Sequence, residues 1–442
     1  MPNSTLALLL VAASCPTTAI LTTSTASAAS STPFGELRAE INASPQAYGD
    51  PFYDQSTNTL HVTMAHPEAL KGTPALRSSD DVDGEALGAR QNVAIEVDSV
   101  KYSHEELKRV MDQISTTQPW TSDVKASLAT WGIDPKADKV EVGLTQVTPA
   151  IAQEASALFG DKVELVTRSR DKSADKITKL SGLPKVVKIA SQDNAKTGTS
   201  ARKSFAPAAA GPPLVDSEPY IGGDRMWREF NVAGQEELEE CTAGGMWSTG
   251  ADAMASAGHC SQPNINWTQG YYDQPNNTLW ETGHMGFAFV NAFSEGGSDS
   301  MLLDGGNYAP YVWSSANGGL QATPVTAATT VAVQGVAVCF DGSFSGTQCS
   351  GHVSIPDQCS IVEGPNPETG IPTDVTVCNQ TRVTSATSIV QFGDSGGPVF
   401  LDLGTSGAAA LGVISALNDN GLTGVYANRT GMMAHFVGDF VI

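Results

Sequence analysis

A serine held among glycines marks one segment of the chain as a candidate site of chemistry. The segment FGDSGGPVF, residues 392–400, places Ser395 behind Asp394 and in front of two glycines. A serine hydroxyl is a poor nucleophile unless a histidine takes its proton and a carboxylate fixes the tautomer of that histidine. Of the seven histidines, His259 in SAGHC stands directly before Cys260. The chain thus holds two of the side chains that acyl transfer to a serine requires.

The two motifs carry a resemblance to a known family. SAGHC and GDSGGP resemble the motifs of the chymotrypsin-fold serine peptidases, and more closely those of their secreted bacterial branch, the streptogrisin and alpha-lytic protease group. That group has a cysteine, then Thr-Ala-Gly-His-Cys, an aspartate before an apolar strand, and Gly-Asp-Ser-Gly-Gly-Pro. The same order is found here in Cys241, His259 with Cys260, Asp299 in GSDSMLL, and Ser395.

The resemblance implies a role for each residue. Ser395 would be the nucleophile, His259 the general base and then the acid, and Asp299 the buried carboxylate that orients the histidine. Asp304 is close in sequence, but Asp299 has the position that matches the family. The backbone N–H groups of Gly393 and Ser395 would form the oxyanion hole. Glycine at 393 lets its amide face the oxyanion without a side chain in the way.

The segment VISALND, residues 413–419, is expected to bind the backbone of the substrate. Ser415 lies near the start of this stretch, and Ala416 and Leu417 stand where the family often has two glycines. Leu417 would narrow the entrance of the primary pocket, beside Phe392. No aspartate stands where a trypsin-like pocket holds its anion. We therefore expect protein or peptide substrates, cut after small or medium apolar residues.

Asp394 lacks the partner that the family provides. In the bacterial group an arginine usually follows the first cysteine of the second disulfide loop and pairs with this aspartate, but Phe340 stands there. A buried carboxylate without a partner would be strongly destabilising. The candidates are the four arginines of the second half and the new N-terminus that removal of a pro-region would create, an arrangement resembling the chymotrypsin switch.

Cysteine usage indicates an oxidising compartment. Besides Cys15, six cysteines lie in the second half of the chain, an even set that suits disulfides. There is no CxxC pair and the histidines are not clustered around the cysteines, so we expect no metal site. We expect no cofactor either. The resemblance implies the pairs Cys241–Cys260 and Cys339–Cys349, which leaves Cys359 for Cys378.

The N-terminal sequence and the charge limit the possible partners. An apolar run, TLALLLVAAS, followed by Ala-Ser-Ala at residues 26–28, is typical of a secretory signal peptide and is too short to cross a bilayer. A lipoprotein signal with Cys15 as the modified residue is the alternative. The net charge is −22, and from Gly211 onward four arginines face 23 acidic residues. We expect a secreted, extracellular monomer without nucleic-acid or membrane partners.

The elements that must position these residues differ between the two halves. A helix is predicted at residues 102–114, with strands at 58–64 and 137–144, which indicates an α+β region. Later runs of β type are separated by turn residues, and a short closing helix is predicted within residues 430–442. The clearest strands are predicted at residues 329–338, 374–378, 398–403 and 409–417.

These elements define the expected domains. The resemblance implies an all-β mature domain of two six-stranded antiparallel β-barrels at residues 214–442. It also implies an α+β pro-region at residues 30–190, which assists folding and inhibits the enzyme until it is removed. A signal peptide is expected at residues 1–29, and a linker with the activation cleavage at residues 191–213. IGGDRM, residues 221–226, resembles the start of the mature chain in the family.

Three functional hypotheses remain. The first is a secreted serine endopeptidase made as a zymogen. The second is a catalytically weak or non-enzymatic barrel that serves as a binding module. The third is an α/β-hydrolase esterase, because GDSGG also matches the nucleophile elbow and both Asp419 and His435 follow it. The run predicted to be a strand directly after Ser395 disfavours the third, because that elbow leads into a helix.

Overall fold

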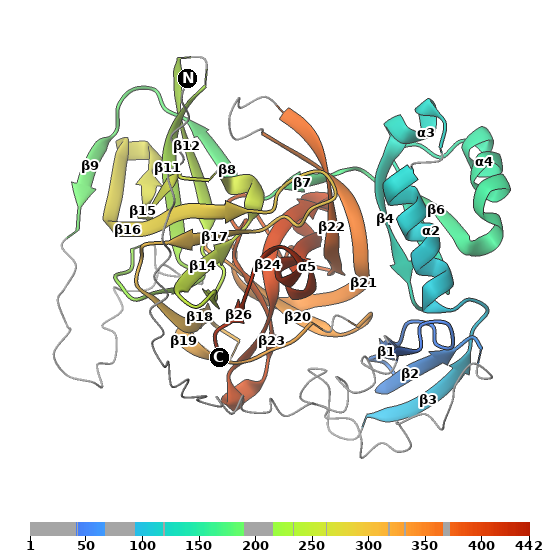
Figure 1. Cartoon of the computed structure of the whole chain (residues 1–442). Coiled ribbons are helices and arrows are strands. Elements are labelled where there is room, and N and C mark those ends of the chain that lie inside the picture. The colour runs from blue at the N-terminus through green and yellow to red at the C-terminus, as the bar shows by residue number, and fades with distance from the viewer. Residues whose placement is uncertain are drawn as a thin grey trace, which may run out of the picture. The chain divides into compact units, whose positions relative to one another are not determined.

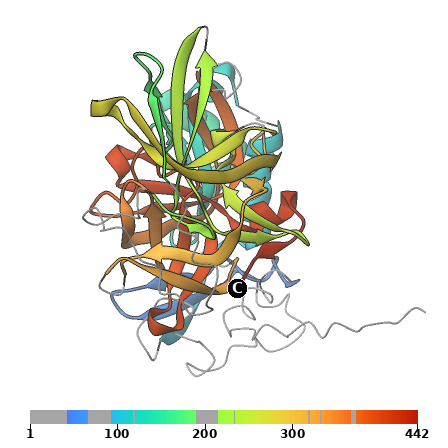
Figure 2. The same cartoon turned by 90° about the vertical axis from the view of Figure 1, so that its left-hand side faces the viewer.

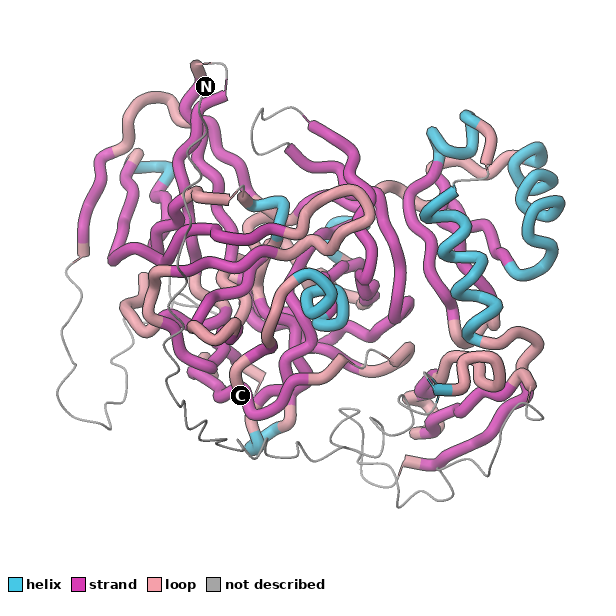
Figure 3. The backbone as a smooth tube through the Cα atoms, viewed as in Figure 1, coloured by secondary structure: helices cyan, strands magenta, loops and turns pink. Residues whose placement is uncertain are grey.

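The described part of the chain comprises three stretches. A computed structural model describes residues 41–66, 93–189 and 215–442, apart from residues 42, 118, 119, 233, 262, 317, 318, 331, 332 and 366–371. The signal peptide expected at residues 1–29 and the linker expected at 191–213 lie outside the described residues. Figure 3 shows that strands dominate and that the longer helices gather in one region. Within these stretches, no helix is long and apolar enough to span a membrane.

A small sheet and an α+β region come first along the described chain. The small sheet has an antiparallel β1–β2 pair and a parallel β2–β3 pair. Its strands are β1 (Phe52–Asp54), β2 (Thr59–Met64) and β3 (Ala94–Ser99). The α+β region contains α2 (His104–Thr117), α3 (Ser122–Ser127), β4 (Leu128–Asp134), β5 (Lys139–Leu144), α4 (Pro149–Phe159) and β6 (Val163–Thr167).

Local sequence explains the first long helix. Ser103 caps α2, because its Oγ accepts a hydrogen bond from Glu106 N–H while the Glu106 carboxylate accepts one from Ser103 N–H. Apolar residues at helical spacing, among them Leu107 and Ile114, bury one face of α2 against β4 and β5. The fully buried Trp131 of β4 lies in the same core and donates its indole N–H to Ser115 Oγ at 2.8 Å. The helix that the sequence predicts is therefore present.

Six strands among the described residues form a first antiparallel ring. Ladders join them in the order β12–β11–β15–β16–β17–β14. The ring closes because Gly244 N–H donates to Ala255 O at 2.8 Å and Ala255 N–H donates to Gly245 O at 2.9 Å. The strands are β11 (Arg225–Val232), β12 (Gln235–Thr242), β14 (Asp252–Ser256), β15 (Asn266–Asp273), β16 (Thr278–Asn291) and β17 (Met301–Asp304).

A second ring of six described strands follows. Each strand pairs antiparallel with the next in the order β20–β21–β22–β25–β24–β23, and β23 returns to β20. Phe340, Ile414 and Tyr426 are buried in its core. The expected all-β half with two antiparallel barrels is therefore present. The strands are β20 (Ala337–Gly342), β21 (Gly346–Pro365), β22 (Pro372–Thr384), β23 (Pro398–Asp402), β24 (Ala408–Asn418) and β25 (Thr423–Asn428).

Shorter elements extend the two rings, and one of them corrects the sequence prediction. The strand predicted at residues 329–338 begins only at Ala337, because Gly335 turns the chain at a φ of 89° and packs so closely on Tyr53 that a Cβ would lie 1.9 Å from its carbonyl oxygen. The predicted closing helix is α5 (Arg429–His435). The other short elements are β10 (Tyr220–Gly222), β13 (Met246–Ser248), β18 (Tyr308–Ser314), β19 (Gln321–Ala328) and β26 (Asp439–Phe440).

Three strands from before the expected linker pair with the rings. β7 (Asp171–Ser173) runs antiparallel to β24 and parallel to β21. β8 (Lys176–Lys179) runs antiparallel to β12, and β9 (Lys185–Lys188) runs parallel to β16. Figures 1 and 2 show the green β8 beside the lime-green β11–β12 hairpin. Strands of the segment assigned to the pro-region thus complete sheets of the barrel half.

Replacing Trp131 should weaken the α+β region. The indole of Trp131 is fully buried, so Trp131→Ala leaves a cavity in the core. Such changes cost about 3–5 kcal/mol of stability. Urea unfolding followed by circular dichroism measures the loss. Leu158→Ala is the control, because that side chain on α4 is 42% exposed and its removal should cost less than about 1 kcal/mol. Equal losses in the two variants would contradict the role assigned to Trp131.

Candidate active site

The turn that carries His259 is fixed by two neighbouring strands. A short 3-10 helix, Gly258–Cys260, follows β14 almost directly. Cys260 is bonded to Cys241 near the end of β12. Asn291, the last residue of β16, donates its side-chain amide to Gly258 O at 2.7 Å. A covalent link and a side-chain anchor therefore hold the histidine in place.

Asp299 and Ser395 contact the two nitrogens of the His259 imidazole. Asp299 Oδ2 lies 2.7 Å from His259 Nδ1, and Asp299 Oδ1 accepts the His259 backbone N–H at 2.8 Å. The second ring nitrogen, Nε2, lies 2.7 Å from Ser395 Oγ. All three residues are buried. With the carboxylate at Nδ1, a neutral imidazole keeps its proton there and leaves Nε2 to accept the serine proton.

Asp304, the competing acid in the sequence, has a different place. It ends β17, and its Oδ1 accepts the N–H of Gly305 at 2.6 Å. Asp299 instead precedes the first residue of β17, Met301, and there its carboxylate contacts the His259 side chain. The structure therefore brings Asp299 to the histidine.

The turn that holds Ser395 presents two N–H groups to one acceptor. Gly393 has a φ of 101°, a conformation that favours glycine, and a Cβ there would lie 2.2 Å from the ring of Phe344. Thr242 of β12 holds the turn, because its Oγ1 donates to Gly393 O at 2.8 Å and its N–H donates to Ser395 O at 2.7 Å. The N–H groups of Gly393 and Ser395 both donate to Ala174 O, at 2.5 and 3.2 Å. The two N–H groups thus converge on one carbonyl oxygen.

Backbone groups surround the Asp394 carboxylate. Its Oδ1 accepts the N–H groups of Phe344 and Ser345 at 2.9 and 3.1 Å, and its Oδ2 accepts the N–H of Gln391 at 2.7 Å. Burial raises the pKa of Asp394, while these hydrogen bonds oppose the rise. The Cζ atom of Arg225 lies 3.5 Å from the centroid of the Phe344 ring, and the charge of Arg225 also interacts with the Asp394 carboxylate. Backbone N–H groups, the Ser345 side chain and the nearby charge of Arg225, one of the candidate arginines, therefore stabilise this carboxylate.

The residues predicted to bind substrate backbone contact a segment of the same chain. Ala174 N–H donates to Ser415 O at 3.4 Å, and the Ser415 hydroxyl donates to Asp299 Oδ2 at 2.5 Å. Ala416 and Leu417 of β24 pair with β7 in antiparallel register. This strand therefore binds an extended segment by main-chain hydrogen bonds, as is expected for a substrate.

Two predicted pocket residues have different environments. Leu417 is buried in the apolar cluster that also contains Ala174. Phe392 is 50% exposed and does not belong to that cluster. Leu417 therefore belongs to the same apolar core as Ala174 and pairs with Lys172 of β7, whereas Phe392 lies outside that core.

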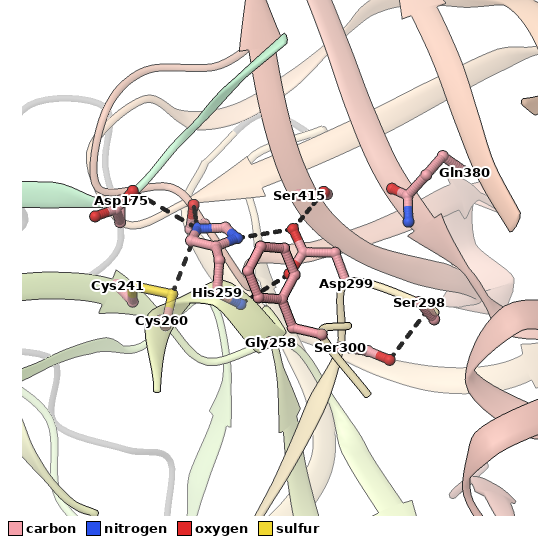
Figure 4. Close-up of polar contacts among 12 residues, drawn as sticks. Asp175, Cys241, Gly258, His259, Cys260, Ser298, Asp299, Ser300, Gln380 and Ser415 are labelled. Carbon is pink, nitrogen blue, oxygen red and sulfur yellow. Dashed lines mark hydrogen bonds and ion pairs between the residues drawn. A yellow bond between two sulfur atoms is a disulfide. The ribbon is translucent and has the colours of Figure 1, made fainter. Parts of the chain in front are cut away.

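Carboxylates surround the His259 imidazole and set its charge. Burial lowers the pKa of His259, but the charges of Asp299, Asp175 and Glu239 outweigh it and raise the pKa to about 9. Asp175 Oδ1 lies 3.7 Å from Nε2, on the side of the ring opposite Asp299. Figure 4 shows the imidazole between these two carboxylates. In the intact chain the imidazolium is therefore favoured at neutral pH.

A buried ion pair lies behind the histidine turn. Arg228 Nε donates to Glu239 Oε2 at 2.6 Å and to Cys260 O at 3.2 Å. Burial raises the pKa of Glu239 to about 7 even though Arg228 opposes the rise. Glu239 also approaches the sulfur atoms of Cys241 and Cys260. Because those atoms form a disulfide, they are not thiolate ligands, and the group does not make a metal site.

Six cysteines form three disulfides in the structure. The pairs are those expected from the sequence: Cys241–Cys260, Cys339–Cys349 and Cys359–Cys378. The third pair joins β21 to β22, the two strands of one hairpin, and both cysteines pack on the core of the α+β region. The bridge therefore holds the hairpin on which β4 aligns.

Sequence reasoning missed residues 171–175, which lie along the edge of β24 beside Ser395; this edge is called the groove below. Asp171 to Asp175 lie in the stretch assigned to the pro-region, and DKSAD matches no motif. A short polar stretch gives no strand signal of its own, because its strand character comes from pairing with β24 and β21. The only signal in the sequence is a small apolar residue, Ala174, within an otherwise polar stretch.

Comparisons with known proteins give structural likenesses only. A scan against protein-family models gives no match, and a search of curated proteins gives none either. Among solved structures, a protease of Nocardiopsis is 22% identical, with a TM-score of 0.33, over 50% of this chain and 98% of its own. A glutamic-acid-specific serine protease is 20% identical, with a TM-score of 0.34, over 50% and 100%. The Rv3671c protease of M. tuberculosis is 16% identical, with a TM-score of 0.28, over 55% and 95%. We base no functional inference on likenesses of this degree.

Proposed function

We propose that the chain is a serine endopeptidase, made as a secreted precursor, that cuts peptide bonds through an acyl-enzyme. One observation carries the proposal: the contacts Asp299–His259–Ser395 lie beside two N–H groups that already hold a peptide carbonyl. Those are the parts that acyl transfer from a peptide requires. The three disulfides support export to an oxidising compartment.

The roles follow from the geometry. Ser395 Oγ attacks the carbonyl carbon of the peptide while His259 Nε2 takes the hydroxyl proton. The N–H groups of Gly393 and Ser395 stabilise the negative oxygen that forms. His259 then gives the proton to the leaving amine, and water releases the acyl group by the same route. Asp299 holds the imidazole in the required tautomer and stabilises the imidazolium.

The substrates and partners follow from the groove. An extended peptide would add to β24 and place a small or medium apolar side chain beside Leu417. The chain's own residues 171–175 occupy this groove, so the pro-region is proposed to inhibit the enzyme as well as to assist its folding. We propose a monomer without a cofactor, whose partners are peptide or protein substrates.

The alternative hypotheses have less support. The esterase hypothesis needs His435 at Ser395, but His435 is exposed at the end of α5 and His259 holds that position. In addition, the strand β23 rather than a helix follows the serine. A barrel kept only for binding would have no need for the contacts that join Asp299, His259 and Ser395.

Substitutions in the triad separate the enzyme hypotheses. Ser395→Ala and His259→Ala should each lower kcat on casein by a factor on the order of 10⁴ or more, because nucleophile and base act as a unit. His435→Ala is the matched control and should leave kcat within about twofold. Rates on casein, with circular dichroism to establish folding, measure the effect. Activity that survives Ser395→Ala would end the peptidase proposal, and loss in His435→Ala alone would favour the esterase.

Leu417 should set the size of the side chain before the cut bond. The wild type should prefer alanine or another small or medium apolar residue there, and Leu417→Gly should raise kcat/KM for phenylalanine relative to alanine by roughly tenfold. A peptide library read by mass spectrometry measures the preference. Leu422→Gly, at a 39% exposed leucine on a neighbouring turn, is the control and should keep the wild-type profile. A profile dominated by arginine or lysine would contradict the assignment.

The protonation of His259 should depend on Asp175. A general base must be neutral, and the pKa of about 9 means that the imidazole of the intact chain loses its proton only as the pH rises through that value. In a Ser395→Ala chain, Asp175→Asn removes a negative charge that stabilises the imidazolium, so the pKa should fall. An NMR titration of ¹⁵N-labelled imidazole gives the midpoint. Asp252→Asn, at the exposed start of β14, should leave it unchanged, and an unchanged midpoint in Asp175→Asn would refute the coupling.

A further inference from the structure

One peptide bond of the chain is held in the groove at Ser395. β7 ends at Ser173 and β8 begins at Lys176, so only Ala174 and Asp175 lie between two paired strands. Before the bond, Ser173 pairs with Ala416 of β24. After it, β8 pairs residue by residue with β12. Main-chain ladders thus fix the chain on both sides of the Ala174–Asp175 bond.

The carbonyl group of this bond is engaged by the proposed oxyanion hole. Ala174 O accepts the N–H groups of Gly393 and Ser395 at 2.5 and 3.2 Å, while Ala174 N–H donates to Ser415 O. His259 Nε2 lies 2.7 Å from Ser395 Oγ and 3.7 Å from Asp175 Oδ1, so the base lies beside the serine hydroxyl and beside the side chain of the residue after the bond. An attacking hydroxyl, a base and an oxyanion site are therefore arranged about one carbonyl.

The side chain before the bond fits its surroundings. Ala174 is fully buried in an apolar cluster that includes Val390, Ile414 and Leu417. Lys172, two residues earlier, is exposed on the same strand. The contact therefore selects by size at position 174 and leaves position 172 to solvent.

We propose that Ala174–Asp175 is the first bond that this enzyme cuts, and that it cuts the bond within its own molecule. The inference rests on the proposed function. In the neutral form of His259, Nε2 takes the proton of Ser395 Oγ, which forms an ester with the Ala174 carbonyl carbon; the C–N bond to Asp175 breaks, and His259 passes that proton to the new amine. Water then hydrolyses the ester, which gives a carboxylate at Ala174 and restores Ser395. One water is consumed and no other reactant is needed.

The cut moves the start of the catalytic domain. β8 and β9 remain joined to β12 and β16 by main-chain ladders, so the new chain begins at Asp175 with two strands that belong to the first ring's sheet. β7 stays paired with β24 and leaves the groove only when the α+β region dissociates. Cleavage in the expected linker at residues 191–213 is a separate event.

The products of the full-length chain test the inference. Intact mass and terminal sequencing of purified wild-type protein should give an N-terminal fragment that ends at Ala174, a terminus that no cut in the linker can create. The Ser395→Ala chain should stay whole at this bond. Mixed with active wild type, the Ser395→Ala chain should still be protected, because its own groove covers the bond. Cutting of that chain at the rate of the wild type would overturn the intramolecular step.

Matched variants and a peptide test the contact at position 174. Ala174→Lys places a charge in the apolar cluster and should slow the cut on the order of a hundredfold. Ser181→Lys adds the same charge at an exposed site and should be cut as the wild type is. A synthetic peptide of residues 171–178 should be cut between Ala174 and Asp175 by active enzyme, and the same peptide carrying Ala174→Lys should not. The peptide keeps the test decisive when the Ala174→Lys chain fails to fold.

The outcomes separate this inference from the proposed function. Casein hydrolysis that depends on Ser395, without any fragment ending at Ala174, overturns the inference and leaves the function intact. A chain that cuts neither casein, nor the peptide, nor itself overturns both. A chain that cuts only at Ala174 supports the inference and limits the activity to the chain's own bond.

Discussion

The 2.7 Å contact between His259 Nε2 and Ser395 Oγ spans two separate strand rings, and the rest of the site depends on it. His259 and Asp299 belong to the first ring, and Ser395 belongs to the second. Two hydrogen bonds, one donated from each ring to the other, join the rings at the site. Thr242 of the first ring anchors Gly393 O in the second, and Ser415 of the second donates to Asp299 in the first. Each ring therefore positions a group of the other ring that we propose to be catalytic.

Buried charge is the cost of this arrangement, and the chain balances each carboxylate differently. Asp299 lies against the imidazole, Glu239 is paired with Arg228, and Asp394 is satisfied by backbone donors. Asp175 adds a further negative charge near Nε2. The segment that brings a peptide bond to Ser395 thus also brings a group that keeps the base protonated. Occupancy of the groove and the protonation state of the base are therefore coupled.

The sequence predicts those residues of the site that stand in recognisable short motifs. His259, Asp299 and Ser395 stand in short motifs, and the capping box of Ser103 predicts the start of α2. The surroundings of Asp394 escaped prediction because its partners are backbone N–H groups, which every residue except proline carries. The late start of β20 escaped because the turn at Gly335 packs on Tyr53, far away in the chain. β7 and β8 escaped because their strand character arises only from pairing.

Main-chain pairing also explains how so polar a segment can occupy the groove. The edges of β24 and β12 on either side of Ser395 carry backbone donors and acceptors that need partners, and β7 and β8 supply them. Such pairing uses main-chain groups only and does not depend on the exposed side chain of Lys172. The buried side chain is that of Ala174, which lies in the same apolar core as Leu417, and we propose that selection acts at this position. Once β7 leaves, the same edge of β24 is open to any extended chain with a small residue at the position of Ala174. We therefore propose that the contacts that hold residues 171–175 are also those that select a substrate.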